Sequence, residues 1–212
     1  MTTTLGVLVA GGAGARLGAG VPKALATLGG ITLLERGVAT LASVCDQVAV
    51  ATPATLDFRI PLRLRTTCGA SPRRVDDRPG PSGPLAGIVA GLSAMPFERA
   101  LVLGVDFPLI EPAFLVALLD RLEGYAAVVP APGGIAQPLA AAYAPVAAEI
   151  LASCHAAGEG APSRALGSLA VRRLDDAELE RMPGGTACLF NLNTAADRAE
   201  AERRLSARAA SR

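Results

Sequence analysis

The sequence predicts an α/β fold in which residues 1–212 form a single domain, with three α/β/α layers around a mostly parallel, twisted sheet. The chain has 212 residues, a length that suits one large domain. Hydrophobic residues make up 51% of it but aromatic residues only 3%. The core must therefore consist mainly of Ala, Val and Leu, which suits helices packed on a parallel sheet. Short apolar runs also alternate with segments of helical periodicity, which indicates repeated strand–helix units.

Four short apolar runs predict buried strands, over residues 5–10, 47–52, 100–106 and 125–131. Apolar positions at helical spacing predict five helices, over residues 31–44 (with Thr32 as a cap), 83–95, 112–122, 145–158 and 195–208. Less regular segments predict one strand near 61–65, a short helix at 163–168 and a strand at 169–174. Residues 137–143 fit either a strand or the start of the next helix, and we favour the strand.

Charge and hydropathy exclude several classes of protein. The formal net charge is +1, so nothing indicates a surface for nucleic acid. The sequence has no uninterrupted apolar run of the ~18 residues that a membrane span needs. Its N-terminus lacks the basic segment of a signal peptide, so we expect a cytoplasmic protein that contacts neither nucleic acid nor membrane. The four scattered cysteines lack metal-site spacing and are interpreted as buried or surface thiols.

A glycine-rich loop follows the first predicted strand, in the segment LVAGGAGARLGAGVPK at residues 8–23. It is not a P-loop, because Lys23 stands between proline and alanine and no Ser or Thr follows it. It also lacks the third glycine of a dinucleotide-binding turn, and Pro22 prevents a long helix from starting there. Glycine amides can approach phosphate oxygens closely, and Arg16 and Lys23 can neutralise phosphate charge. The segment is either a phosphate-binding loop or a solvated loop with two incidental cations.

An acidic residue, Asp106, stands at the end of the third predicted strand, in the segment LVLGVDFP at residues 101–108. Ligands of open α/β sheets bind outside the carboxyl ends of the strands, where the glycine loop and Asp106 should meet. Mg²⁺ prefers one or two carboxylates together with substrate phosphates and waters. Asp106 is therefore a candidate Mg²⁺ ligand, and the alternative is an Asx-type turn residue.

The glycine loop resembles the signature of the nucleotidyltransferase superfamily, in which GG-x-G-x-R is followed by Pro-Lys or Asp-Lys. Further segments resemble those of molybdenum cofactor guanylyltransferases, the branch that joins GMP to molybdopterin, and they occur in the same order: GPSGPLAGIVAGL at 80–92, LGVDFPLI at 103–110, QPLAAAY at 137–143 and FNLNTAAD at 190–197. The resemblance covers most of residues 5–205 and implies a Rossmann-like nucleotidyltransferase fold.

The resemblance implies a Mg²⁺-dependent transfer of GMP from GTP to the phosphate of molybdopterin, with release of pyrophosphate. It also implies contact with other proteins of molybdenum cofactor synthesis or with apo-molybdoenzymes. Pro22 departs from the branch, which usually has Asp before the loop lysine, whereas Pro-Lys is typical of sugar-phosphate relatives. Cytidylyl transfer to molybdopterin, nucleotidyl transfer to a sugar phosphate or another small phosphate acceptor, and a non-catalytic nucleotide-binding module therefore remain alternatives.

The resemblance also assigns roles to individual residues. Arg16, Lys23 and Asp106 are the expected catalytic residues, and Asp106 is the expected metal ligand. The expected nucleotide-binding residues are these three and Leu8, Ala10, Gly11, Gly12, Gly14, Asp77, Gly83 and Gly87. The acceptor should be bound by Gln137, Arg164, Asn191 and Asn193.

Several of these residues have a simpler interpretation. Asp77 and its neighbour Asp76 fit a salt-bridged surface turn as well as a contact with guanine. Arg164 fits an ordinary surface arginine, and Asn193 fits a cap for the last helix. His155 is the only histidine, and no acid or nucleophile stands at a useful spacing from it. We interpret it as a packing or solvated residue without a catalytic role.

Overall fold

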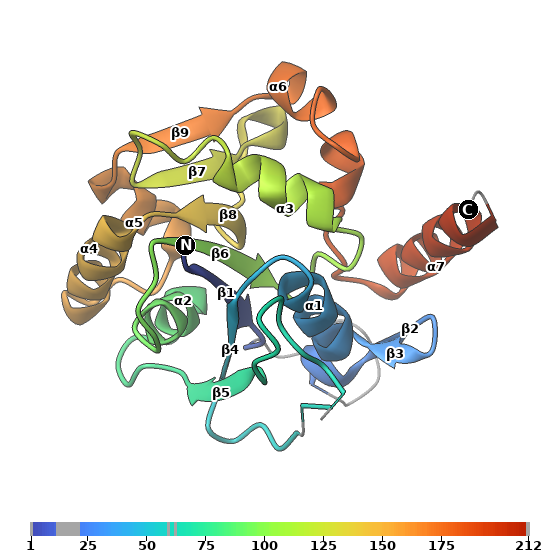
Figure 1. Ribbon diagram of the computed structural model, residues 1–212, viewed down its shortest axis with the longest axis horizontal. Coiled ribbons are helices and arrows are strands. Elements are labelled where there is room, and N and C mark those ends of the chain that lie inside the picture. The colour runs from blue at the N-terminus through green and yellow to red at the C-terminus, as the bar shows by residue number, and fades with distance from the viewer. Residues whose placement is uncertain (1, 12–21, 59, 62, 211–212) are drawn as a thin grey trace.

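A seven-stranded sheet lies at the centre of the computed structural model, which describes residues 2–11, 22–58, 60–61 and 63–210. The strand order is β5-β4-β1-β6-β8-β7-β9 (Figure 1). In chain order these strands are β1 (Thr4–Val9), β4 (Gln47–Thr52), β5 (Arg73–Asp76), β6 (Arg99–Gly104), β7 (Ala127–Pro130), β8 (Ala140–Tyr143) and β9 (Val171–Leu174). Every neighbouring pair is parallel except those that involve β8, which is antiparallel to β6 and β7. The predicted mostly parallel sheet is confirmed.

Helices cover both faces of this sheet. One face carries α1 (Leu33–Ala42) and α3 (Pro112–Leu119), and the other carries α2 (Pro84–Leu92) and α4 (Pro145–Ala156) (Figure 1). The predicted three-layer α/β/α arrangement is therefore confirmed. The remaining elements are α5 (Pro162–Ala165), α6 (Asp176–Glu180), α7 (Ala195–Ala210), the hairpin strands β2 (Thr27–Leu28) and β3 (Ile31–Thr32), and the 3-10 turns η1 (Lys23–Leu25), η2 (Pro132–Gly134), η3 (Leu166–Ser168) and η4 (Gly185–Leu189).

The central strand β1 is buried along its whole length, as expected for a parallel strand covered on both faces. Two helices approach it closely because each has a glycine at the contact. A Cβ atom at Gly91 of α2 would lie 2.1 Å from Val7 Cγ1, and one at Gly37 of α1 would lie 2.5 Å from Leu8 Cδ1. These glycines therefore set the distance between the helices and the sheet.

The connection between β4 and α2 differs from the prediction. The prediction of a strand near 61–65 is wrong for the residues of this range that are described, 61 and 63–65, where the Leu64 N–H instead donates to the Pro61 carbonyl at 3.0 Å. The strand that follows β4 in the chain is β5, which begins at Arg73, twelve residues after Pro61. It lies at the edge of the sheet, and three of its four residues are exposed. Because its sequence RRVD is mostly polar, hydropathy does not reveal it.

The other predicted elements are present, several with shorter bounds. Residues 140–143 form a strand, which decides between the two expectations for this segment. Thr32 caps α1 as expected, because its hydroxyl accepts from the Glu35 N–H at 3.1 Å and the Glu35 carboxylate accepts from the Thr32 N–H at 3.2 Å. The cysteines are free thiols, two of them buried. None of the described helices combines the length and apolar character that a membrane crossing requires.

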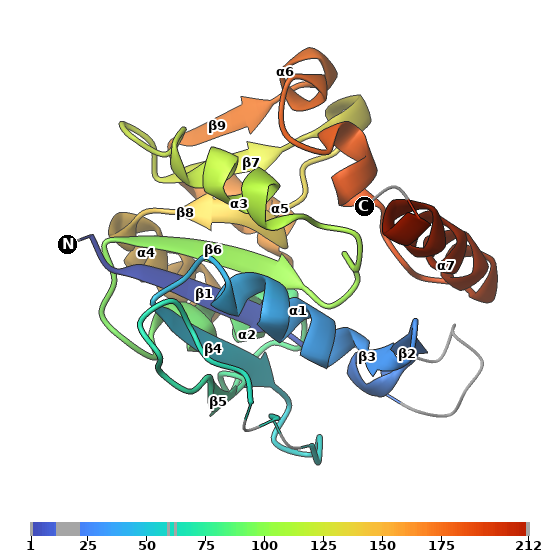
Figure 2. The same ribbon diagram turned by 45° about the vertical axis from the view of Figure 1, so that its right-hand side comes forward.

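α7 lies beside the sheet and not on one of its faces. Figure 2 shows it next to the β2–β3 hairpin, away from α2 and α4. Ala201 is its fully buried contact with the rest of the protein, and Arg208 Nη1 donates to the Leu109 carbonyl at 2.9 Å. The segment just before α7 is held at the candidate site by two other contacts: the Leu192 N–H donates to the Asp106 carbonyl at 2.8 Å, and Lys23 Nζ donates to Asn193 Oδ1 at 2.9 Å.

Candidate functional site

The carboxyl ends of four parallel strands share one edge of the sheet. The polypeptide leaves this edge through Gly11 after β1, Pro53 after β4, Asp77 after β5 and Asp106 after β6. The ends of β6 and β1 are directly joined, because the Val105 N–H donates to the carbonyl of Val9 at 3.2 Å. The predicted meeting of the glycine loop and Asp106 at one edge is therefore realised for the part of the loop that the structure describes.

A polar cluster formed by Lys23, Asp106, Asn191, Asn193 and Asp197 lies at this edge, and we call it the Lys23 cluster. Lys23 Nζ donates to Asn193 Oδ1 at 2.9 Å and lies 3.8 Å from Asp106 Oδ2. Asn193 Nδ2 donates to Asn191 Oδ1 at 2.6 Å, and Asn191 Nδ2 donates to Asp106 Oδ2 at 3.1 Å. The hydrogen bonds run in one direction, from the ammonium group through two amides to the carboxylate.

The backbone holds both ends of this cluster in place. Asp106 stands two residues beyond β6, where the Phe107 N–H closes a turn on the Gly104 carbonyl at 3.3 Å. The carbonyl of Asp106 itself accepts from the Leu192 N–H at 2.8 Å. This bond attaches the segment that contains both asparagines to the end of β6, so the asparagine side chains flank the Asp106 carboxylate.

The start of α7 supplies a second carboxylate to the cluster. Asp197 Oδ2 accepts from the backbone N–H groups of Asn193 at 2.9 Å and Thr194 at 2.7 Å, and Thr194 Oγ1 accepts from the Asp197 N–H at 3.1 Å. Thr194 therefore caps the helix, and the Asn193 side chain is directed to Lys23. The capping interpretation of Asn193 is wrong for its side chain. The backbone hydrogen bond from Asn193 is the main cause of the lowered pKa of Asp197.

Lys23 is more buried than most lysines, with 14% of its side chain exposed. Burial lowers the pKa of its ammonium group, and the charges of Asp106 and Asp197 partly oppose this shift. A partly desolvated cation interacts more strongly with a nearby anion than one in bulk water. The cluster therefore holds a positive charge that a phosphate group can use.

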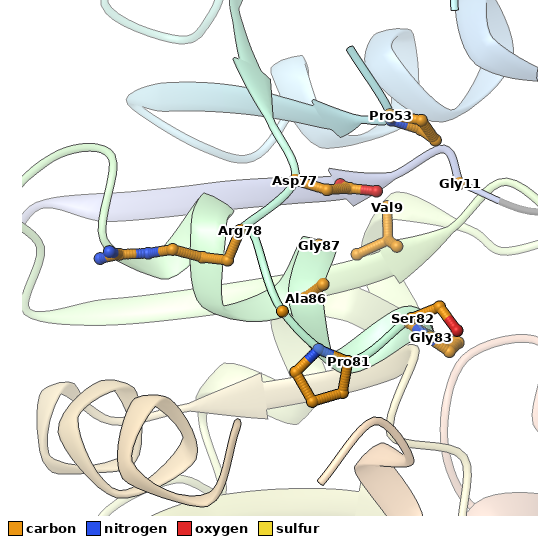
Figure 3. Close-up of a pocket in the computed structure, with 12 residues that line it drawn as sticks. Val9, Gly11, Pro53, Asp77, Arg78, Pro81, Ser82, Gly83, Ala86 and Gly87 are labelled. Carbon is orange, nitrogen blue, oxygen red and sulfur yellow. The ribbon is translucent and has the colours of Figure 1, made fainter. Parts of the chain in front are cut away.

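A pocket of about 340 Å³ lies at the same edge of the sheet as the Lys23 cluster, between the ends of β1 and β5 and the start of α2 (Figure 3). Asp77 points into it from the end of β5. Two glycines leave room for its carboxylate: a Cβ atom at Gly11 would lie 3.3 Å from Asp77 Oδ2, and one at Gly87 would lie 3.2 Å from Asp77 Oδ1. The pocket is lined by Val9, Gly11, Pro53, Asp77, Arg78, Gly80, Pro81, Ser82, Gly83, Pro84, Ala86 and Gly87.

The two adjacent acids after β5 have different surroundings. Asp76 is exposed and lies 3.4 Å from Arg74 Nη2, as a salt-bridged surface residue would. Asp77 Oδ1 is buried and has no hydrogen-bond partner among the described residues. Burial raises the pKa of Asp77, and the charge of Asp76 adds to this shift. Within the described part of the chain Asp77 therefore offers an unused acceptor, and of the two acids it is the candidate for ligand binding.

The backbone at the start of α2 packs against Gly160, in the segment after α4. Gly83 is its N-cap, with φ +144°, and a Cβ atom there would lie 2.3 Å from the Gly160 carbonyl oxygen. Pro84 has no N–H, and the Leu85 N–H donates to the same Gly160 carbonyl at 3.3 Å. Gly83 and Gly87 line the pocket, and Gly87 also lies beside Asp77. The Leu85 N–H at the helix start, however, already donates to the Gly160 carbonyl and is not free for a ligand.

The remaining nucleotide-binding candidates divide into two groups. Leu8 is fully buried within β1, and Ala10 is buried with its N–H donated to the Ala51 carbonyl at 2.8 Å. In their place, the structure brings Val9 and Pro53 to the pocket. Gly12, Gly14 and Arg16 lie outside the described residues, so their roles remain predictions.

The four acceptor-binding candidates do not lie together. Asn191 and Asn193 belong to the Lys23 cluster. Gln137 lies on the same sheet edge, between β7 and β8, and its Nε2 donates to the Ile135 carbonyl at 3.3 Å. Arg164 instead forms an exposed ion pair with Glu159, with Nε 2.6 Å from Oε2. This pair lowers the pKa of Glu159 to about 2.

Sequence reasoning missed two parts of this arrangement. Asp197 was not among the candidate site residues, although the spacing of Thr194 and Asp197 fits a reciprocal cap that fixes the direction of the segment before it. The contribution of Val9, Pro53 and Pro81 to the pocket has no signal in the sequence, because apolar residues and prolines at strand ends are common.

Comparison with known proteins identifies the family. The family described as MobA-like NTP transferase domain matches residues 6–174. A probable molybdenum cofactor guanylyltransferase of Chloroflexus aggregans is 37% identical over 91% of this chain and 90% of its own length. A protein of the same printed name from Natronomonas pharaonis is 33% identical over 83% of each chain. These matches confirm the resemblance described from the sequence motifs.

Solved structures confirm the fold. The crystal structure of molybdopterin-guanine dinucleotide biosynthesis protein A from Archaeoglobus fulgidus aligns with a TM-score of 0.76 at 24% identity, over 96% of this chain and 99% of that one. 2-C-methyl-D-erythritol 4-phosphate cytidylyltransferase from Thermus thermophilus aligns with a TM-score of 0.64 at 22% identity, over 95% of this chain and 97% of that one. The predicted Rossmann-like nucleotidyltransferase fold is therefore confirmed, and the chain belongs to the MobA-like NTP transferase family of nucleotidyltransferases.

Proposed function

We propose that this enzyme transfers GMP from GTP to the phosphate of molybdopterin, with Mg²⁺ bound, and releases pyrophosphate. The names of the relatives that match most of the chain support this reaction. The observation that carries the choice of nucleotide is the Asp77 carboxylate, whose buried Oδ1 has no donor among the residues that the structure describes, in a pocket at the same sheet edge as the Lys23 cluster. The product would then pass to another protein of molybdenum cofactor synthesis or to an apo-molybdoenzyme.

The chemistry of the pocket favours guanine over cytosine. Guanine presents an N1–H and a 2-amino group, which are two adjacent donors for one carboxylate. Cytosine presents a single donor, its 4-amino group, beside an acceptor at N3, so it can satisfy only one carboxylate oxygen and sets a lone pair against the other. A site built to hydrogen-bond a donor strongly rejects an analogue that lacks it, because the buried acceptor then stays unpaired. Asp77 therefore supports GTP as the nucleotide substrate.

The Lys23 cluster fits a magnesium ion in its chemistry. Asp106 provides a carboxylate, and the two asparagines provide amide oxygens, which are the hard ligands that Mg²⁺ accepts. Asp106 Oδ2 accepts from Asn191, whereas Oδ1 has no hydrogen bond within the described ranges. Asp106 would hold the ion, with Asn191 orienting its carboxylate. When bound, the ion would neutralise phosphate charge and polarise the phosphorus that is attacked.

The reaction needs alignment and charge neutralisation more than covalent help from the protein. A phosphate oxygen of the acceptor attacks the α-phosphorus of GTP and forms a new P–O bond. The bond between the α-phosphorus and the bridging oxygen breaks, and pyrophosphate leaves with that oxygen and its electron pair. Lys23 would turn from Asn193 to the phosphates and stabilise the leaving charge, and Arg16 would do the same from the loop.

A direct assay tests this proposal. Purified protein is mixed with Mg²⁺, molybdopterin and either GTP or CTP, and pyrophosphate release is measured. We expect release with GTP and almost none with CTP. Release with CTP alone would indicate a cytidylyltransferase, and release only when a sugar 1-phosphate replaces molybdopterin would move the enzyme to the branch that Pro22 resembles. Nucleotide binding without turnover on any acceptor would support a non-catalytic module.

A further inference from the structure

The loop from Gly80 to Gly83, which we call the GPSG loop, forms the wall of the pocket opposite Asp77 (Figure 3). The loop and its two flanking residues have few backbone N–H groups that could stabilise it by internal hydrogen bonds. Pro79, Pro81 and Pro84 have no N–H to donate. Gly80 and Gly83 have φ values of +133° and +144°, which residues with side chains rarely adopt. The shape of this wall must therefore be fixed by groups outside the loop.

His155 supplies one of these groups from α4. Only 5% of its surface is exposed, and its Nε2 lies 3.2 Å from the Pro81 carbonyl oxygen. Because a carbonyl oxygen can only accept, Nε2 carries the proton and donates. The ring also packs against the loop backbone, since a Cβ atom at Gly80 would lie 3.0 Å from His155 Cε1.

The segment after α4 contacts the C-terminal end of the same loop. The Gly160 carbonyl accepts from the Leu85 N–H at 3.3 Å, and a Cβ atom at Gly160 would lie 2.4 Å from the Ser82 carbonyl oxygen. One helix and its C-terminal extension thus hold both ends of the GPSG loop. His155 provides the side-chain hydrogen bond in this contact, and the rest is backbone.

We infer that His155 is a positioning residue for nucleotide binding, which fixes the GPSG loop as the wall against which the base is held. This inference rests on the proposed function, because it takes the Asp77 pocket as the base site. His155 does not line the pocket, so it acts through the Pro81 carbonyl and not by touching the substrate. In the proposed binding mode the triphosphate would extend to the Lys23 cluster, whose residues do not line this pocket. Loss of His155 should therefore weaken binding of the base but not of the phosphates.

Two substitutions separate the hydrogen bond from the filling of space. His155→Leu fills the position but removes the donor, and His155→Gln restores an N–H at a similar distance along the side chain. With Mg²⁺ present, calorimetric titration should show the Kd for GTP rising about 5-fold in the Leu variant, the effect of one hydrogen bond. The Kd for inorganic tripolyphosphate should stay unchanged. The Gln variant should recover most of the affinity for GTP, and kcat at saturating GTP should change little in either variant.

Two further variants complete the experiment. Ser153→Ala changes an exposed position on the same helix and should leave both Kd values at the wild-type level. Gly80→Ala presses on the His155 ring from the other side and should weaken GTP binding selectively, which tests the contact even if a His155 variant fails to fold. Melting temperatures identify the folded variants.

The results distinguish this inference from the proposed function. An equal loss of affinity for both ligands, no loss for GTP, or no recovery with Gln would overturn the role of His155. A wild-type protein that binds tripolyphosphate but not GTP would instead overturn the proposed function, and the inference with it.

Discussion

Two carboxylates at the same edge of the sheet have opposite surroundings. Asp106 faces a lysine at 3.8 Å and accepts a hydrogen bond from Asn191. Asp77 has a buried oxygen without a partner among the described residues, and its pKa is raised by burial. Both stand within two residues of the end of a parallel strand, so the topology treats them alike. The difference comes from what packs around them: the segment before α7 against Asp106, and glycines and prolines against Asp77.

This comparison separates two kinds of binding. A carboxylate among cations and amides suits a site where charge is exchanged between a lysine, a metal ion and phosphates. A carboxylate without a donor suits a neutral partner that brings N–H groups, because an unpaired buried acceptor costs stability until it is satisfied. Substitutions at Asp106 and Lys23 should therefore change turnover, and substitutions at Asp77 should change the choice and affinity of the nucleotide.

Asp106→Ala should have the largest effect. The variant loses the carboxylate proposed to hold the metal ion, so pyrophosphate release should fall about 1,000-fold, the upper range for loss of one electrostatic group in an active site. Asp120→Ala, which removes an exposed acid at the end of α3, is the matched control and should retain activity. Turnover close to wild type in Asp106→Ala would remove this residue from the metal site.

Lys23→Met should come next. It keeps much of the side-chain volume but removes the charge that is proposed to stabilise the leaving pyrophosphate, so kcat/KM should fall about 100-fold. Arg121→Gln removes a cation whose Nη1 donates to the Ala117 carbonyl on α3, and it should leave kcat/KM unchanged. If both variants lost activity equally, the effect would belong to net charge and not to the Lys23 cluster.

Asp77→Asn should change selectivity. The amide keeps the shape but presents an N–H₂ group toward the donors of guanine, so the KM for GTP should rise about 10- to 100-fold while kcat changes little. Asp76→Asn is the matched control at the neighbouring position, where the side chain is 62% exposed. Steady-state kinetics with GTP and CTP provide the measurement, and unchanged preference for GTP in Asp77→Asn would contradict the base assignment.

The smallest effect concerns stability as a function of pH. Burial raises the folded-state pKa of Asp77 above its ordinary value of 3.8, so the folded chain binds this proton more tightly than the unfolded chain does. The ionised carboxylate therefore costs stability above the raised pKa, and this cost disappears as the pH falls toward 3.8. The ligand-free Asp77→Asn variant should melt at a higher temperature than wild type at pH 7, and the difference should shrink in acid. A lower melting temperature at pH 7 would indicate that a ligand-independent donor already satisfies the carboxylate.

The sequence allowed much of the fold to be predicted, because β1, β4 and β6 are continuous apolar runs that only a doubly covered sheet can bury. β5 was misplaced because an exposed edge strand needs no apolar pattern. The antiparallel direction of β8 was also beyond prediction, since hydropathy carries no information on strand direction.

The candidate site, too, could be predicted only in part. The topological rule for sheet edges was enough to bring the loop lysine and Asp106 together. It could not distinguish Asp76 from Asp77, because successive side chains at a strand end point in opposite directions and the sequence does not say which one faces the pocket. Nor could it foresee that Arg164 pairs with Glu159, a contact made within one short loop.

The Lys23 cluster joins residues that are far apart in the sequence and are therefore synthesised at different times. Lys23 and its partner Asn193 are separated by 170 positions, which a ribosome needs about 10–30 s to translate. The Asp77 pocket, by contrast, is complete once α2 and the segment after α4 have emerged. A growing chain can therefore form the wall of the pocket once Gly160 has emerged, 33 positions before Asn193 completes the cluster.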